Sequence, residues 1–287
     1  MNPRVVLVVA RLTIREISRR RILWVLGLLS LVSVVLVGWG VDRLVSQARQ
    51  NEVNAYELEI GVSQILILIA FMFSFVLAMS AAFLAAPAIA SDVETGTVLA
   101  MLARPMHRAD LVLGRWLGLG IIVAAYAVGS GLLAVGVVRL VSGYSPPMIA
   151  VALAYLAFEA VAVMTMALAL GTRLPGIAAG AITVVMFGLG WFLGVLGSLS
   201  AAFGVQSAAG AGDAFRLLFP TDGLWRGVIY GLEPPQVVSM TQLGGPVVAS
   251  NPFYADTPPA MAFTVWCVVW MVGVLAIGAW LFRRREL

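Results

Sequence analysis

Apolar runs long enough to cross a membrane recur along the whole chain, and they constrain its fold more than any other feature. A run of about 20 apolar residues crosses the roughly 30 Å hydrocarbon core of a bilayer as a helix. Only 11% of the 287 residues are charged, and the mean hydropathy is +1.00, whereas about a quarter of the residues are charged in soluble domains. The sequence therefore predicts an all-α polytopic membrane protein built as a single transmembrane domain.

We expect six membrane-spanning helices. Their expected ranges are 22–41, 62–90, 111–138, 148–171, 177–199 and 260–282. The second and third ranges are longer than the roughly 20 residues that a span needs. We therefore expect these two helices to tilt, or to extend beyond the bilayer into the cytoplasm.

Residues 1–21 precede the first span and are predicted to form an amphipathic helix. At 100° per residue, several arginines gather on one side and apolar residues on the other, which is typical of a helix that lies at the membrane surface with its cations among lipid headgroups. The arginines of this side are Arg4, Arg11, Arg15 and Arg19. A secretory signal is the alternative, but no small-x-small cleavage site follows the apolar run, so we expect the segment to be retained.

The arginines also predict the orientation of the chain. With the N-terminus inside, thirteen of the 18 basic residues fall on inner segments, including the tail 283–287. Cytoplasmic loops carry such an excess of arginine. The acidic segment 42–59 then lies outside. We expect a multi-pass protein of a bacterial inner membrane with both termini in the cytoplasm.

Several chemistries are excluded by residues that the chain lacks. It contains no lysine, so it cannot form the Gly-Lys-Ser/Thr loop that holds the phosphates of ATP. It has one cysteine, Cys267, and one histidine, His107, which is too few for an ordinary Cys/His zinc site or an internal disulfide. We expect no catalytic residues, no metal and no cofactor in this chain, and no nucleic-acid partner.

The charged segment between the second and third spans, residues 91–110, is the first candidate site. We expect a short amphipathic helix here, with Glu94 and Thr97 near its start, where carboxylates and hydroxyls favour a helix N-terminus. Gly96 would allow close approach to another backbone. Arg104 precedes Pro105, which disfavours helical geometry in the residue before it and so ends the helix. The alternative is a solvated cytoplasmic turn.

The long segment between the fifth and sixth spans, residues 200–259, is the second candidate site. Residues 215–230 within it are too apolar for a free loop and too short to span. We expect an interfacial or re-entrant helical hairpin, broken at Pro220 and Gly223.

Three further residues belong to this hairpin. Asp222 and Arg226 are spaced to pair across one helical turn, and Trp225 suits the headgroup layer. The alternative is an extracytoplasmic loop, rich in glycine and proline, with no special role.

Glu159 falls near the middle of the fourth span. A charge at this depth costs at least about 2.5–3.5 kcal/mol on insertion scales, so the side chain should face the protein interior. Two interpretations stay open: a group that lines a transport path, and an interhelical hydrogen bond in the packed core. The glycines of the fifth span likewise favour either helix packing within one subunit or an interface between two subunits.

Taken together, three sequence elements resemble one protein family. They are the basic N-terminal helix ending at Trp24, the segment Asp92-Val-Glu94-Thr-Gly96-Thr97 followed by Arg104-Pro105, and the last span ending Phe282-Arg-Arg-Arg-Glu-Leu287. They resemble the permease subunits of type-2 ABC transporters (the type V exporter class). The branch that looks nearest contains the permease of the nitrous-oxide-reductase maturation system.

The resemblance implies a six-helix permease with an N-terminal elbow helix and a re-entrant element before the last span. A coupling region at Asp92, Glu94, Gly96, Thr97, Arg104 and Pro105 would dock onto a separate ATPase that binds ATP and magnesium. Two ATPases and a second permease, identical or not, would complete the transporter. The apolar spans favour a hydrophobic or amphipathic cargo.

Two alternatives share this architecture or part of it. In the first, the complex moves no substrate and transmits ATP-driven motion to an extracytoplasmic partner. The second is an ion-coupled carrier built around Glu159. Such carriers usually show internal repeats, and the sequence contains none that we recognise.

Overall fold

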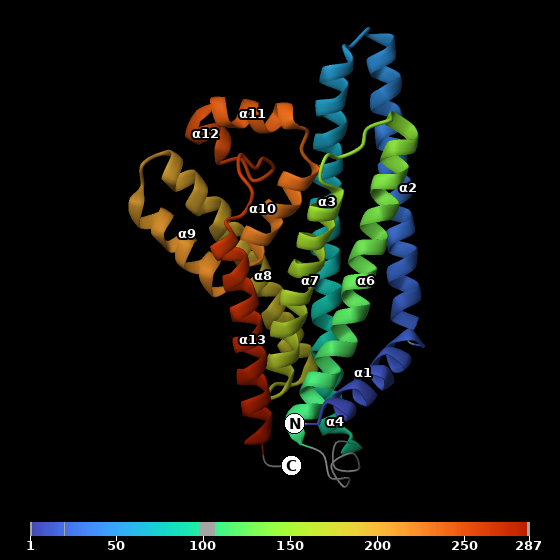
Figure 1. Cartoon of the computed structure of the whole chain (residues 1–287), viewed down its shortest axis with the longest axis vertical. Helices are drawn as coiled ribbons and strands as arrows, with labels where there is room; N and C mark the ends of the chain where they lie inside the picture. Colours follow the sequence, from blue (N-terminus) through green and yellow to red (C-terminus); the bar gives the residue numbers. More distant parts are fainter. Residues whose placement is uncertain (1, 20, 98–106, 286–287) are drawn as a thin grey trace.

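The computed structural model describes residues 2–19, 21–97 and 107–285, and the regular elements among them are all helices (Figure 1). Six helices are long and apolar enough to cross a membrane. They are α2 (Arg21–Gln50), α3 (Ala55–Ala85), α6 (Arg108–Ser142), α7 (Ile149–Gly171), α8 (Gly176–Ala202) and α13 (Met261–Arg283). The predicted all-helical membrane protein with six spans is confirmed.

Local chemistry sets the helix boundaries. The Asn54 side chain accepts a hydrogen bond from the backbone N–H of Tyr56 and caps the start of α3. Pro87 begins the short α4 (Pro87–Glu94) directly after α3, at the helix position where its missing N–H costs nothing. Gly143 ends α6 with φ +77°, a conformation that glycine adopts without a steric penalty.

Helix α7 lies at the centre of the bundle. It packs against α3, α6, α8 and α13, and against α10 (Thr221–Leu232) from the segment before the last span. Its alanines bring these neighbours close, and Ala160, Ala162 and Ala167 are all buried. The main apolar core therefore surrounds α7 rather than any pair of consecutive helices.

The hairpin of α2 and α3 is longer than a bilayer is thick. At 1.5 Å per residue, the 30 residues of α2 rise roughly 45 Å, against about 30 Å of hydrocarbon. The extra length lies at the end away from the termini (Figure 1). Residues 42–50 and 55–59 continue α2 and α3 at this end, and the tilt or cytoplasmic extension expected of the second span stays a prediction.

The segment between α8 and α13 folds into four helices. They are α9 (Gln206–Leu218), α10, α11 (Pro235–Leu243) and α12 (Gly245–Ala249). Helix α9 packs along α8, and α10 packs into the bundle against α7. The segment 215–230, where a hairpin was expected, holds the end of α9 and most of α10, and α11 and α12 follow at the far end of the molecule (Figure 1).

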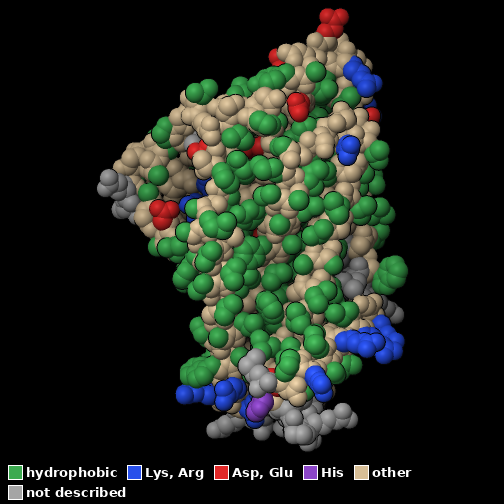
Figure 2. All heavy atoms as spheres, viewed as in Figure 1, with side chains coloured by type: hydrophobic (Ala, Val, Ile, Leu, Met, Phe, Trp, Pro, Cys, Tyr) green, Lys and Arg blue, Asp and Glu red, His purple; other side chains and the backbone are tan. Residues whose placement is uncertain are grey.

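Both termini lie at the same end of the molecule (Figure 1), as an even number of spans requires. Figure 2 shows basic side chains gathered at this end on the visible face, with a broad apolar band beyond them. We call the end that carries the termini the proximal end, and the opposite one the distal end.

Candidate functional site

The break between α3 and α4 lies at the proximal end of the bundle. A side chain at Gly171, in the last turn of α7, would overlap the carbonyl of Ala86, and one at Gly176 would come 3.0 Å from the Cα of Pro87. The two glycines thus let the break rest directly on the connection between α7 and α8. Helix α4 ends at Glu94, and Gly96 follows with φ +72°.

A buried arginine joins three elements at this end. Arg115 lies on α6, two turns from its start, and its side chain is only 7% exposed. Its guanidinium donates to Oε2 of Glu16 at 2.5 Å and to Oδ2 of Asp92 at 2.6 Å. Glu16 belongs to α1 (Pro3–Ser18) and Asp92 to α4. One side chain therefore holds α1, α4 and α6 together, through charge-assisted hydrogen bonds that are stronger than neutral ones.

Two glycines of α6 bring α1 against the same region. A side chain at Gly114 would come 2.5 Å from the Cβ of Val9, and one at Gly118 would come 2.7 Å from the carbonyl oxygen of Ala10. The backbone N–H of Asn2 adds a 3.3 Å bond to Oδ2 of the buried Asp110. Helix α1 thus lies in a groove of α6 that only glycine leaves open.

The end of α13 is tied to the same cluster. Arg108, the first residue of α6, donates to the carbonyl oxygen of Arg285 at 2.6 Å, and Arg285 donates to that of Thr172 at 2.7 Å. These bonds satisfy carbonyls that would otherwise lack partners at helix C-termini. A displacement of α4 would therefore act on α6 and α1, to which Arg115 connects it. Through the bonds of Arg108 and Arg285 it would also act on the ends of α13 and α7. We call the Glu16–Arg115–Asp92 set and these bonds the proximal cluster.

The expected coupling residues separate into three groups. Asp92 points inward to Arg115, whereas Glu94, Gly96 and Thr97 are exposed. Arg104 and Pro105 lie outside the described residues. Glu94 is the last residue of α4 and lies three residues before Thr97, where helical backbone resumes. Gly96 has φ +72°, which favours glycine. No described atom of this chain lies within 4 Å of a Cβ at Gly96, and its close approach to another chain stays a prediction.

Glu159 is buried between α7 and α3. Its exposed fraction is 3%, and Oε2 accepts a 3.1 Å hydrogen bond from the hydroxyl of Ser74. The sequence left two interpretations of Glu159 open, and this geometry favours the interhelical hydrogen bond. The neighbouring Phe71 lies in an aromatic cluster with Trp191 and Trp225, so the surroundings are packed.

Asp222 and Arg226 of the expected hairpin lie close together, but Asp222 also binds a residue that was not expected. Asp222 is buried and accepts from Arg216 at 2.8 Å as well as facing Arg226 at 3.8 Å. Gly194 of α8 leaves the space that the carboxylate occupies. The pairing of Asp222 and Arg226 was predicted. Arg216, which comes from α9, was missed because it approaches through the turn at Pro220.

Two expectations about this hairpin are wrong. Trp225 does not lie in the headgroup layer: it is 2% exposed, and its Nε1 donates to the carbonyl oxygen of Pro252 at 3.3 Å. Gly223 does not break the helix, because it lies inside α10 against the ring of Phe263. The break falls at Pro220 alone. The fifth-span glycines Gly194 and Gly197 face this hairpin, which confirms packing within the subunit.

Three buried charged groups, Asp110, Arg115 and Glu233, were not predicted as site residues, although Arg115 ends one of the segments that resemble the family. Arg115 carried a usable signal, because an arginine inside an apolar run needs a partner. Glu233, between α10 and α11, carried none. It is 1% exposed, and its Oε2 accepts from the backbone N–H of Ala255 at 3.2 Å. Burial, together with Asp256, raises the pKa of Glu233 to about 8.

Comparison with known proteins agrees with this arrangement. The sequence model of a family described as ABC-2 family transporter protein matches residues 7–287. The chain belongs to the ABC-2 family of transporter membrane proteins. A search of curated proteins gives no match.

Family membership makes the chain the permease subunit of an ABC transporter and implies an ABC ATPase as its partner in the membrane. The match begins within α1 and runs through α13, so it covers the proximal cluster, all six spans and the segment between α8 and α13. In this ABC-2 protein the contacts with the partner must be made where the permease leaves the bilayer. The proximal end is one of two such surfaces.

Proposed function

We propose that this chain is the permease of an ATP-driven exporter. Separate ABC ATPase subunits, two per transporter, bind ATP and magnesium and hydrolyse the ATP, while this chain supplies no catalytic residue and no cofactor site. A second permease, identical or related, completes the transporter. The cargo is hydrophobic or amphipathic, because the spans offer few polar side chains to a hydrophilic one.

The proximal cluster is the observation that supports this proposal most directly. The exposed residues Glu94, Gly96 and Thr97 lie at the end of α4 and directly after it, while Asp92 of α4 binds Arg115. An ATPase that docks there, on α4 and on the following residues with Arg104 and Pro105, pushes on a helix that is bonded to α6 and α1. Helix α1 then acts as the elbow helix and α4 begins the coupling region.

The push can do work only if the two conformations of the permease differ in their affinity for the ATP-bound partner, since a ligand shifts a conformational equilibrium by its differential affinity alone. The single arginine at the junction provides a rigid connection. The charge pair of Arg115 with Asp92 transmits the motion of α4 to α6, and the pair with Glu16 transmits it to α1.

The α9–α10 hairpin acts as the re-entrant element. Side chains at Gly227 and Gly231 of α10 would overlap Tyr155 or come within 2.7 Å of the backbone of Ala152, so α10 lies directly on α7. The excess of arginine on the inner segments supports our assignment of the proximal end, and with it both termini, to the cytoplasm of a bacterial cell.

The test is joint purification with the ATPase encoded beside this gene, followed by ATP hydrolysis in vesicles. Replacing Glu94 and Gly96 by Ala and Val should reduce both co-purification and substrate-stimulated hydrolysis. The matched control is Gln50→Ala, an exposed change at the distal end. Unchanged assembly and hydrolysis in the double variant would contradict the proposed coupling region. Hydrolysis that responds only to an added extracytoplasmic protein would instead favour transmission of motion.

A further inference from the structure

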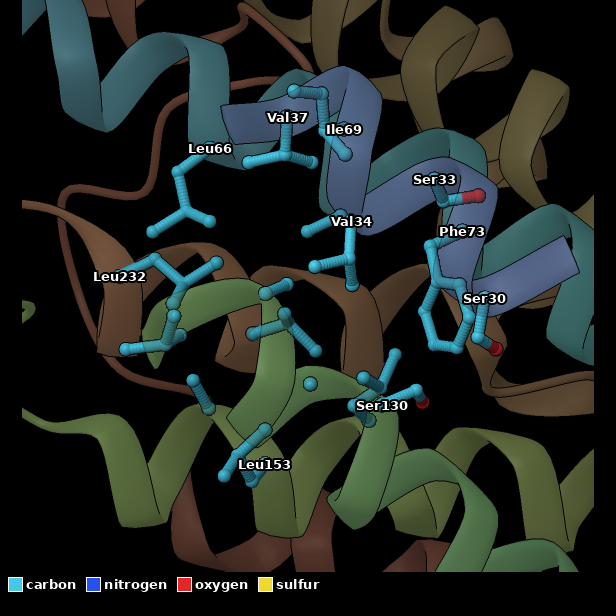
Figure 3. A pocket seen from close by; sticks show the side chains of 17 residues that line it. Ser30, Ser33, Val34, Val37, Leu66, Ile69, Phe73, Ser130, Leu153 and Leu232 are labelled. Atoms are coloured by element: carbon cyan, nitrogen blue, oxygen red, sulfur yellow. The ribbon is translucent and has the colours of Figure 1, made fainter. Parts of the chain in front are cut away.

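A cavity lies between α2 and the rest of the bundle, in the distal half of the membrane-spanning region (Figure 3). Helices α2, α3, α6, α7 and α10 contribute its lining. The centre of a water-sized sphere can move through about 40 Å³ of it, several times the roughly 10–15 Å³ that one water molecule needs. The space is therefore large enough for several carbon atoms of a chain.

Two contacts between α2 and α6 bracket this cavity. Towards the proximal end, the hydroxyls of Ser30 and Tyr126 lie 2.5 Å apart. Towards the distal end, a Cβ on Gly38 would come 2.8 Å from Cγ1 of Val137. These points are eight residues or roughly 12 Å apart on α2, and the cavity lies along the stretch of α2 between them.

The lining offers no polar group to a ligand. Its three hydroxyls belong to serines, and each already has a partner within the protein. Ser33 donates to the carbonyl oxygen of Leu29 at 2.9 Å, and Ser130 to that of Tyr126 at 2.5 Å, while Ser30 bonds to the Tyr126 hydroxyl. Water needs two to four polar partners to occupy such a space, so an apolar occupant is favoured.

The cavity is open on one side and closed on the other. Leu153 and Leu156 of α7 and Val228 of α10 are buried and form its floor. On the other side the lining is half-buried at Val34 of α2, Phe73 of α3 and Ala134 of α6, whereas Val37 and Val135 beside them are buried. The cavity therefore reaches the outer surface beside Val34 and Ala134, next to the apolar Leu133, which is 60% exposed.

We propose that this cavity binds the end of one hydrocarbon chain of a bilayer phospholipid, which enters beside α2. The bilayer itself surrounds the opening at this depth and supplies such chains without any diffusion through water. The bound chain completes the packing between α2 and the other helices that line the cavity. Its attraction comes from filling space against apolar walls, because an unfilled void forfeits dispersion contacts along its lining.

The experiment uses the full chain in phosphatidylglycerol vesicles that contain a small fraction of phosphatidylcholine with a diazirine near the end of one acyl chain. After illumination, labelled residues are mapped by mass spectrometry. We expect adducts at Val34 and Ala134, which face the cavity. Ala134→Phe fills the space and should lower labelling of Val34 by roughly fivefold or more, since close-packed interiors leave no room for both groups.

Leu133→Phe is the matched control, because it adds the same ring to the outward side of α6 and should leave labelling of Val34 unchanged. If Ala134→Phe does not purify as a folded protein, Val34→Phe is made from the opposite wall, and labelling of Ala134 is measured instead. Adducts confined to outward residues such as Leu133, or equal cavity labelling in the filled variant, would overturn the proposal. A second permease that covers the opening would give the first of these results.

Discussion

At the residue scale, Arg115 is the side chain on which the proximal end depends. Its guanidinium is shared by carboxylates from two helices that are distant in sequence. A buried ion pair contributes little relative to an apolar replacement of the whole set, but removing Arg115 alone takes a charge-assisted hydrogen bond from each of the two carboxylates. The arrangement is therefore sensitive to single substitutions and tolerant of joint ones.

We predict that Arg115→Met destabilises the protein by about 1.5–3 kcal/mol, the range for losing a hydrogen bond between charged groups. The loss should be measured as a lower Tm of the purified protein in detergent. Arg11→Met, on the exposed face of α1, is the control and should change the Tm little. Adding Asp92→Asn and Glu16→Gln to Arg115→Met should recover part of the loss. An unchanged Tm in the single variant would contradict the bridging role.

Glu233 is the second residue whose environment has a measurable consequence. Because burial raises the pKa of Glu233 to about 8, the folded protein holds the proton more tightly than the unfolded chain does. Between the ordinary carboxyl pKa and pH 8 the folded state therefore binds more protons, and stability falls as the pH rises through this window. Above about pH 8 both states have lost the proton and the dependence ends.

We predict that the wild-type Tm in detergent falls between pH 5 and pH 8, and that Glu233→Gln removes most of this slope, since each pKa unit corresponds to about 1.4 kcal/mol. The amide oxygen of Gln can still accept from the backbone N–H of Ala255. The exposed Glu57→Gln on α3 is the matched control and should keep the wild-type slope. Parallel pH profiles for wild type and Glu233→Gln would show that Glu233 is not the group responsible.

At the element scale, glycines decide which helices touch. Gly114 and Gly118 of α6 have α1 against them, whereas Gly129 and Gly136 of the same helix have no described atom within 4 Å of a Cβ. In a lipid environment, where packing rather than hydrophobicity drives helix association, such small residues mark the contact face. The groove on α6 is therefore the surface on which α1 packs.

We predict that Gly118→Ala loosens α1 from α6, because the added methyl group meets the carbonyl oxygen of Ala10, which belongs to backbone. Overpacking of this kind costs about 1–3 kcal/mol. The Tm should fall, and trypsin should cut faster at the arginines of α1. Gly136→Ala is the control with open space around it and should be neutral or slightly stabilising. Equal protease resistance in both variants would argue against the groove.

At the scale of the whole molecule, the far ends of the bundle differ in character. The proximal end carries both termini, α4 and the basic side chains seen in Figure 2. The distal end carries the turn between α2 and α3, and the helices α11 and α12 (Figure 1). A transporter driven by a soluble ATPase needs its ends to face different compartments, and the proposed orientation assigns the proximal end to the cytoplasm.

We predict that cysteines at the two ends react differently with a membrane-impermeant maleimide in intact cells. The only native cysteine, Cys267, is buried and is replaced by alanine as background. Gln50→Cys, at the distal end, should be labelled, whereas Thr97→Cys should be labelled only after the cells are opened. Both positions are exposed in the structure. The reverse pattern would place the termini outside and refute the proposed site of ATPase docking.

The sequence by itself determined the membrane class and the number and approximate ranges of the spans. Long apolar runs leave the chain few alternatives, because backbone polar groups in lipid must be satisfied within helices. It also indicated the break at Pro220 and the pairing of Asp222 with Arg226, since proline and the spacing of one helical turn act locally. These are short-range effects that a pattern of residues carries directly.

The tertiary structure alone decided which residues meet across the bundle. Arg115 finds Glu16 and Asp92 at sequence separations of 99 and 23 residues, and no periodicity in the sequence encodes that choice. Trp225 was placed at the membrane surface by its residue type, yet the close packing of α10 on α7 buries it. Partners at such separations are set by how helices cross, and the crossing depends on the side chains of every helix at once.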